Sequence, residues 1–98
     1  MDLSGKRAIV TAGAAGIGRT VAERFMSAGA TVSVCDIDDR ALQSFSQAFP
    51  DASAFKCDVG DASAVAETFK SMENVLGGVD ILVNNAGSAG PTAGIEDI

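Results

Sequence analysis

The chain has 98 residues, of which 47% are apolar and 20% are charged, and it shows no internal repeat or low-complexity tract. This composition excludes a disordered tail and provides enough apolar side chains for one small core. The formal net charge is -6, and the few basic residues are scattered along the sequence. Because phosphate backbones require clustered Lys and Arg, we expect neither nucleic acid nor an anionic membrane as a partner.

The N-terminal region and the cysteines exclude further classes of protein. The apolar run at residues 8–10 is too short for a secretory signal or a transmembrane helix, so we expect a cytoplasmic protein. Cys35 and Cys57 do not have the CxxC spacing of a metal or redox pair, and no His is present to complete a mixed zinc site. We therefore predict two buried core thiols and no bound metal.

Strands and helices are predicted to alternate in the first half of the chain. A β-branched run predicts a strand at residues 7–11, and the apolar spacing from Gly16 onward predicts a helix. Residues 31–36 predict a second strand, and a helix follows that Asp38 caps and Pro50 ends. The apolar positions expected on the first helix are Ile17, Val21, Phe25 and Ala28.

The second half continues the alternation. Residues 53–59 predict a third strand, Asp61 caps a helix that Gly77 and Gly78 close, and residues 80–84 predict a fourth strand. The helices supply the long crossovers that parallel pairing requires. We predict an α/β fold of three layers, with a parallel sheet in the order 3-2-1-4, the first two helices on one face and the third on the other. The order reverses between the first and fourth strands, where such sheets bind ligands.

The stretch TAGAAGIG, residues 11–18, joins the first strand to the first helix with very little side chain. A phosphate group at a helix N-terminus collects backbone N–H donors, but only where no Cβ holds it away. Gly18, one turn inside the helix, is expected to let that helix lie close to the strand. Taken alone, the stretch fits a tight strand-to-helix connection equally well.

Acidic residues end the second and third predicted strands. Asp36 lies where an acid accepts hydrogen bonds from the two ribose hydroxyls of a dinucleotide, and its charge repels a 2′-phosphate, so NAD is preferred over NADP. The alternative for Asp36, a solvated acid that caps the next helix, fits the acids that follow it better. The echo of VCDI in KCDV places Asp58 and Val59 at the adenine pocket. The NNAG stretch, residues 84–87, ends the fourth strand and is by itself an ordinary Asn/Gly turn.

These four motifs, in this order and at these spacings, resemble the short-chain dehydrogenase/reductase family over the whole chain. The resemblance implies a Rossmann-type sheet, NAD-dependent hydride transfer between alcohols and ketones, and a complete enzyme that is a homo-oligomer. It also implies that Asp36 holds the adenosine ribose, that the glycine-rich turn meets the pyrophosphate, and that Asn84 is mainly structural. The cofactor-binding residues implied are Gly13, Ala15, Gly16, Ile17, Asp36, Asp58, Val59, Asn85, Ala86 and Gly87.

Two departures from the family pattern limit what this chain does. Ala12 stands where the family usually has the first glycine of the turn, which is tolerable if its φ is negative. The family's catalysis uses a Ser and a TyrxxxLys pair for acid–base work, and this chain has no Tyr. We therefore assign it no catalytic residue. We expect residues 1–98 to be a single NAD-binding segment, with about four of the family's seven strands, that stops before the catalytic part.

Three functional hypotheses stay open at this point. In the first, the chain supplies the adenosine and pyrophosphate half of the NAD site of an alcohol or ketone oxidoreductase and is inactive alone. In the second, it is a non-enzymatic nucleotide-binding module. In the third, it is an inactive truncated fragment whose uncovered fourth strand makes it self-associate. Response regulators and P-loop proteins fit worse, because the first strand runs into TAGAAG and no Gly-Lys-Ser/Thr is present.

Overall fold

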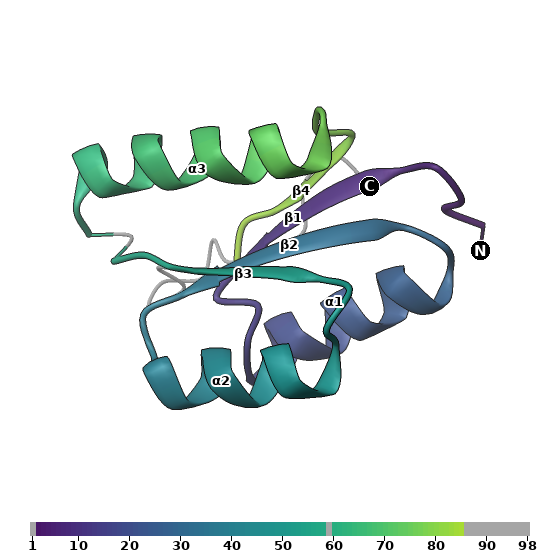
Figure 1. The fold of residues 1–98 in the computed structure, drawn as a ribbon, viewed down its shortest axis with the longest axis horizontal. Coiled ribbons are helices and arrows are strands. Elements are labelled where there is room, and N and C mark those ends of the chain that lie inside the picture. Colours follow the sequence, from purple (N-terminus) through teal and green to yellow (C-terminus); the bar gives the residue numbers. More distant parts are fainter. Residues whose placement is uncertain (1, 59, 86–98) are drawn as a thin grey trace.

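The computed structural model describes residues 2–58 and 60–85, which form three layers (Figure 1). The middle layer is a parallel sheet of four strands in the order β3-β2-β1-β4, and Figure 1 shows α1 and α2 on one face and α3 on the other. The strands are β1 (Arg7–Thr11), β2 (Thr31–Asp36), β3 (Ser53–Lys56) and β4 (Ile81–Val83). The helices are α1 (Gly16–Ser27), α2 (Asp39–Ala48) and α3 (Ala62–Leu76). The predicted strand order and the predicted placement of the helices are confirmed.

The third and fourth strands are shorter than the sequence predicts. β3 ends at Lys56, which pairs with Asp36, the last residue of β2. Beyond that pair the neighbouring strand is finished, and only the Cys57 N–H still donates to the Asp36 carbonyl, at 2.9 Å. β4 begins at Ile81. Just before it, the Asp80 N–H donates to the Arg7 carbonyl at 2.8 Å, and the Arg7 N–H donates to the Asp80 carboxylate at 2.9 Å. β3 therefore stops where β2 ends, whereas at the start of β4 the Asp80 side chain satisfies the Arg7 N–H.

Successive side chains of each strand point to opposite faces of the sheet, so apolar side chains pack in one core on each face. On the face covered by α1 and α2, the strand residues Ala8, Val10 and Val34 pack in one cluster with Phe25 and Phe45, all at most 5% exposed. The smaller cluster beneath α3 consists of Ile9, Cys35, Cys57 and Met72. Burial on both faces explains why the strands contain nearly continuous apolar runs.

Both cysteines are buried and free, as predicted. Burial raises the pKa of the Cys35 thiol to about 11, and the nearby Cys57 adds to the rise. The Cys35 thiol therefore stays protonated at neutral pH and packs as a small apolar group.

Asp side chains start two of the three helices. Asp38 accepts hydrogen bonds from the backbone N–H groups of Arg40 and Ala41 at the start of α2, at 2.9 and 3.2 Å. Asp61 does the same for the first turn of α3. These carboxylates satisfy amides that have no partner inside the helix. Both predicted caps are confirmed, and α1 begins without one.

Arg7 joins the end of α3 to the start of the sheet. Its Nε donates to Asp80 Oδ2 at 3.0 Å, and its terminal nitrogen donates to the Gly77 carbonyl at 2.7 Å. Gly77 lies in the left-handed region, with φ of 79°, and ends α3 as predicted. The Arg7 side chain thus ties the C-terminus of α3 to both β1 and β4.

Candidate nucleotide-binding site

The turn between β1 and α1 starts with a residue in a strained conformation. Ala12 has φ of +52°, the only positive φ of a non-glycine residue in the described part of the chain. The condition under which the sequence makes Ala12 tolerable, a negative φ, is therefore not met. A side chain in the left-handed region costs about 1–2 kcal/mol, because its Cβ crowds the following carbonyl. The turn needs this conformation, since the chain must reverse within a few residues to enter the helix.

Gly13 is buried and serves the packing of the turn. Its N–H donates to the Cys35 carbonyl at 3.2 Å, so the end of β2 already uses this donor. A Cβ on Gly13 would lie 2.7 Å from a methyl carbon of Val34 and 2.9 Å from the Val10 carbonyl oxygen. The glycine that the sequence assigns to the cofactor therefore fixes the shape of the turn, with its own N–H directed into the sheet.

Gly18 lets α1 lie directly against the end of β1, as expected. A Cβ there would overlap the Ala12 carbonyl oxygen and approach the Asn85 side-chain nitrogen to 2.9 Å. The same Asn85 nitrogen lies 3.5 Å from the Ala12 oxygen. Gly18 thus brings the start of α1 and the end of β4 to one point.

The N-terminus of α1 is open to solvent and has no capping side chain. Its N-cap residue, Ala15, offers no side-chain acceptor, and the first turn holds no acid. Around Gly16 a Cβ would meet nothing within 4 Å, and Ile17 is 76% exposed. The amides of the first turn have no partner within a helix, so they are directed to solvent or to a ligand. Ile17 fits the apolar spacing of the predicted helix, but its side chain is exposed and does not join the core.

Asp36 lies beside this turn and is bonded to it. Its Oδ2 accepts a hydrogen bond from the Ala14 N–H, and its Oδ1 accepts one from the Asp38 N–H, both at 3.2 Å. The residue is only partly buried, and a carboxylate oxygen that accepts one hydrogen bond can accept another. The carboxylate therefore sits at the edge of the turn with its charge accessible.

The end of β4 is fastened to the end of β1 through Thr11. The hydroxyl oxygen of Thr11 accepts the Asn85 N–H at 2.8 Å. The same hydroxyl lies within donating distance of the Asn84 side-chain oxygen, 3.2 Å, and of the Val83 carbonyl, 3.4 Å. Asn84 and Asn85 are thus held at the sheet reversal between β1 and β4.

The remaining predicted residues follow β3 and β4 in the sequence. Asp58 is exposed, and its carboxylate accepts the Gly60 N–H at 2.9 Å, which shapes the loop after β3. The other three predicted residues, Val59, Ala86 and Gly87, lie outside the described residues.

Ile37 lies beside the candidate site but is not among the residues predicted from the sequence. This side chain follows Asp36 directly and is 58% exposed, although it is large and apolar. An apolar residue between acids in CDIDD, just after a strand, is the signal that could have found it. Ile37 offers an apolar surface next to the candidate ribose-binding acid.

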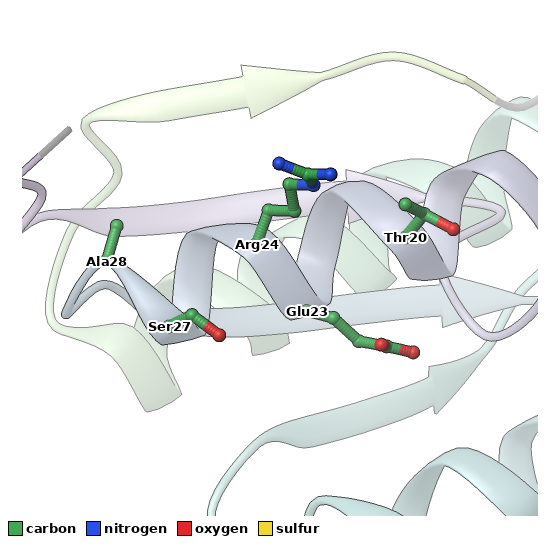
Figure 2. Close-up of a pocket in the computed structure, with 5 residues that line it drawn as sticks. All are labelled: Thr20, Glu23, Arg24, Ser27 and Ala28. Carbon is green, nitrogen blue, oxygen red and sulfur yellow. The ribbon is translucent and has the colours of Figure 1, made fainter.

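A surface hollow of about 540 Å³ lies elsewhere, along α1, where Figure 2 shows the side chains that line it. The lining residues are Thr20, Glu23, Arg24, Ser27 and Ala28. None of them is a predicted site residue, and the hollow is open to solvent. The candidate site is therefore defined by the strand ends and the start of α1.

Two other kinds of site were sought among residues 2–58 and 60–85. No group of three or more His, Cys, Asp or Glu side chains there is placed to hold a metal ion. In the same residues, no helix has the length and apolar character needed to cross a membrane.

Comparison with known proteins identifies the family. The family model described as short chain dehydrogenase matches residues 6–97, so the chain belongs to that family. The chain is 42% identical over 87 residues to a galactitol 2-dehydrogenase from Agrobacterium fabrum, covering 88% of this chain and 34% of that protein. It is 40% identical over 95 residues to a 7alpha-hydroxysteroid dehydrogenase from Escherichia coli, covering 93% of this chain and 37% of that protein.

Solved structures agree with the fold. A short chain dehydrogenase from Mycobacterium smegmatis superposes with a TM-score of 0.82 at 36% identity, over 92% of this chain and 41% of that one. A blue fluorescent protein from a metagenomic library, in complex with NADPH, superposes with a TM-score of 0.82 at 31% identity, over 89% and 38%. The chain thus spans between a third and about two fifths of the length of these four proteins.

Proposed function

We propose that this chain supplies the adenosine and pyrophosphate half of the NAD site of a short-chain dehydrogenase that oxidises alcohols or reduces ketones. The observation that carries the proposal is the uncapped start of α1 beside the accessible carboxylate of Asp36, at the reversal of the sheet order. In sheets of this type, nucleotides bind at that reversal.

The start of α1 fits the phosphate end of a dinucleotide. The amides of residues 16–18 have no intrahelical acceptor, and the open space at Gly16 admits an anion to them. Positive ends of the peptide dipoles favour negative charge at the same place. Because the Gly13 N–H donates to the Cys35 carbonyl, it is not free for a ligand, and we assign Gly16 to the pyrophosphate side.

The acid at the end of β2 fits the ribose. Each oxygen of Asp36 accepts one backbone N–H and can accept a further bond, which matches the two hydroxyls of an unmodified ribose. A 2′-phosphate would bring two negative charges next to this carboxylate, so NAD is preferred over NADP. We propose that Asp58 and the exposed Ile37 flank the adenine, and the family resemblance adds Val59 to them.

The relatives support the general class of reaction. Several are named as dehydrogenases of alcohols, such as galactitol and hydroxysteroids, and one structural neighbour contains NADPH. When bound, the nicotinamide ring supplies the hydride acceptor or donor, and the residues described here hold the other end of the cofactor. Asn85 is proposed to line the cofactor from the end of β4, with Ala86 and Gly87.

The catalytic groups are proposed to lie in another part of the complete enzyme. The 98 residues contain no Tyr, and the chain spans about a third of its dehydrogenase relatives. We propose that residues 1–98 form one NAD-binding segment, inactive alone, of a cytoplasmic homo-oligomer. Sequencing the reading frame past Ile98 tests this, because a downstream Ser and TyrxxxLys are expected. If the intact mass of the natural protein equals that of residues 1–98, the enzyme proposal is wrong. The second hypothesis, a non-enzymatic nucleotide-binding module, would then take its place.

Calorimetry with the natural polypeptide tests the nucleotide site. We expect NAD and AMP to bind, and NADP to bind at least about tenfold more weakly than NAD, a difference of about 1.4 kcal/mol. The variant Asp36→Ala is expected to lose most of that preference. Asp39→Ala is the matched control, since Asp39 is an exposed acid whose partner is the surface residue Lys56. No detectable binding of NAD or AMP, or a preference that Asp36→Ala leaves intact, contradicts the proposal.

A further inference from the structure

Arg19 lies in the second turn of α1 and reaches across to α2, which lies beside α1 on the same face of the sheet (Figure 1). Its Nε donates to the Glu23 carboxylate at 3.0 Å, and a terminal nitrogen donates to the Ser44 hydroxyl at 3.2 Å. Its guanidinium carbon lies 5.9 Å from the centre of the Phe45 ring and 5.4 Å from that of Phe49. The planar group of Arg19 thus makes hydrogen bonds to Glu23 of α1 and Ser44 of α2 and lies near the rings at the end of α2.

These contacts require an arginine. A planar guanidinium stacks on aromatic rings and donates in its own plane at the same time, whereas a Lys ammonium is a single point charge. The two rings themselves pack at 5.1 Å, and Phe45 is fully buried. Arg19 therefore lies beside a packed ring pair at the C-terminal end of α2, and Glu23 neutralises its charge.

The contacts of Arg19 with α2 help to fix the position of the start of α1, because no capping side chain holds that start. Among residues 2–58 and 60–85, the bond from Arg19 to Ser44 is the one hydrogen bond that joins α1 to α2. α2 itself is fixed to the end of β2, where the Asp38 N–H donates to Asp36. Asp36 in turn holds Ala14 of the turn. The turn and the first residues of α1 are thus held from two sides by the same β2 and α2 unit.

We propose that Arg19 is a positioning residue for the phosphate end of the nucleotide site. By holding α1 against α2, it sets the direction of the amides of residues 16–18 relative to Asp36. It acts through geometry, since its own charge is paired with Glu23 and its group faces α2. This inference rests on the proposed nucleotide function.

The test compares ligands that differ in phosphate content, with the natural polypeptide and its Arg19→Gln variant. Dissociation constants for NAD, AMP and adenosine are measured by calorimetry and ligand-observed NMR, and unfolding is measured in urea. Arg19→Gln is expected to raise the dissociation constants for NAD and AMP about five- to tenfold and to change that for adenosine by less than about twofold. Arg24→Gln is the matched control on the same helix, and it is expected to bind all three ligands like the unaltered protein.

Further variants separate position from charge. Arg19→Lys keeps the charge but loses the planar group, so it is expected to bind NAD as weakly as Arg19→Gln. If Arg19→Gln does not fold, Ser44→Ala and Phe49→Leu are used, because each removes one contact of Arg19. Each is expected to weaken NAD binding about two- to fourfold relative to adenosine binding. Full rescue by Arg19→Lys, equal weakening of all three ligands, or unchanged NAD and AMP binding overturns the inference. Failure of the unaltered protein to bind NAD and AMP overturns the proposed function, and this inference with it.

Discussion

The carboxylate of Asp36 accepts the N–H of Ala14 at 3.2 Å, so the end of β2 holds the turn that follows β1. The two residues are 22 positions apart, and the bond connects the acid proposed for the ribose to the turn proposed for the phosphates. One side chain therefore shapes the site and contributes to it. Substitutions at Asp36 are expected to change stability as well as ligand preference.

Asp36→Asn is expected to separate these two roles. The amide keeps one acceptor oxygen, so one of the two backbone bonds is lost, and the free energy of unfolding falls by about 1 kcal/mol. The charge disappears, so the ratio of NADP to NAD affinity rises. Urea unfolding and calorimetry measure the two effects. An Asp36→Asn protein with unchanged stability and an unchanged ratio would contradict both roles, and Asp39→Asn serves as the surface control.

Ala12→Gly is expected to stabilise the protein. Glycine reaches the φ of +52° without the Cβ clash, which removes a strain of about 1–2 kcal/mol, although greater freedom of the unfolded chain offsets part of the gain. We expect a net increase of about 0.5–1 kcal/mol in the free energy of unfolding. Ala14→Gly, at a buried alanine of the same turn, is expected to have the opposite sign. Destabilisation by Ala12→Gly would show that the alanine methyl contributes packing that outweighs its strain.

Gly18→Ala is expected to be strongly destabilising. The new methyl overlaps the Ala12 carbonyl, and backbone on both sides leaves little room to relax, so we expect a loss of about 2–3 kcal/mol. Gly77→Ala is the comparison, since Gly77 has positive φ but open space around it, and its cost is expected to be about 1 kcal/mol from strain alone. Chemical unfolding of both variants measures the difference. A Gly18→Ala protein as stable as the parent would refute the close approach of α1 to β1.

The ion pair between Arg7 and Asp80 predicts a pH dependence of stability. The hydrogen bonds from the Arg7 side chain and backbone lower the pKa of the Asp80 carboxyl below its ordinary value. A lowered pKa in the folded state stabilises the fold above about pH 4, and this contribution is lost as the pH falls through the folded-state value. Asp80→Asn removes it, so the variant should lose less stability on acidification than the parent does.

Urea unfolding between about pH 6 and pH 3 measures this difference. The control is Asp51→Asn, which removes an exposed acid that has no ion pair with the described residues. Equal acid sensitivity of the parent and Asp80→Asn would contradict the prediction. Because both partners of the pair are partly exposed, added salt should reduce the effect.

The sequence predicts the features of this fold that depend on local patterns. The alternation of strands and helices implies parallel pairing, and Asp38 and Asp61 stand where capping residues are expected. The strand order follows from the two helices on one face and the third on the other. The alternation and the caps are short-range signals, the strand order follows from the rules for parallel crossovers, and the structure agrees with each of them.

Features that depend on contacts between distant segments escaped the sequence analysis. The sign of φ at Ala12 is set by how β1 must turn into α1, and the bond from Asp36 to Ala14 depends on the register of β1 and β2. Ile17 has helical spacing but lies on the open side of the first turn, so periodicity alone misplaced it. The assignment of Gly13 to a ligand missed that its N–H is used by Cys35.

The missing cap of α1 links the ligand to folding. α2 and α3 each carry an acid that satisfies their first amides, whereas α1 leaves its first amides to the solvent. A bound phosphate group would complete α1 as Asp38 and Asp61 complete the other two helices. At a ligand concentration one hundred times the dissociation constant, such binding adds about 2.7 kcal/mol to the stability of the fold. The cellular supply of the nucleotide would then govern how much of the protein survives proteolysis, independently of any turnover.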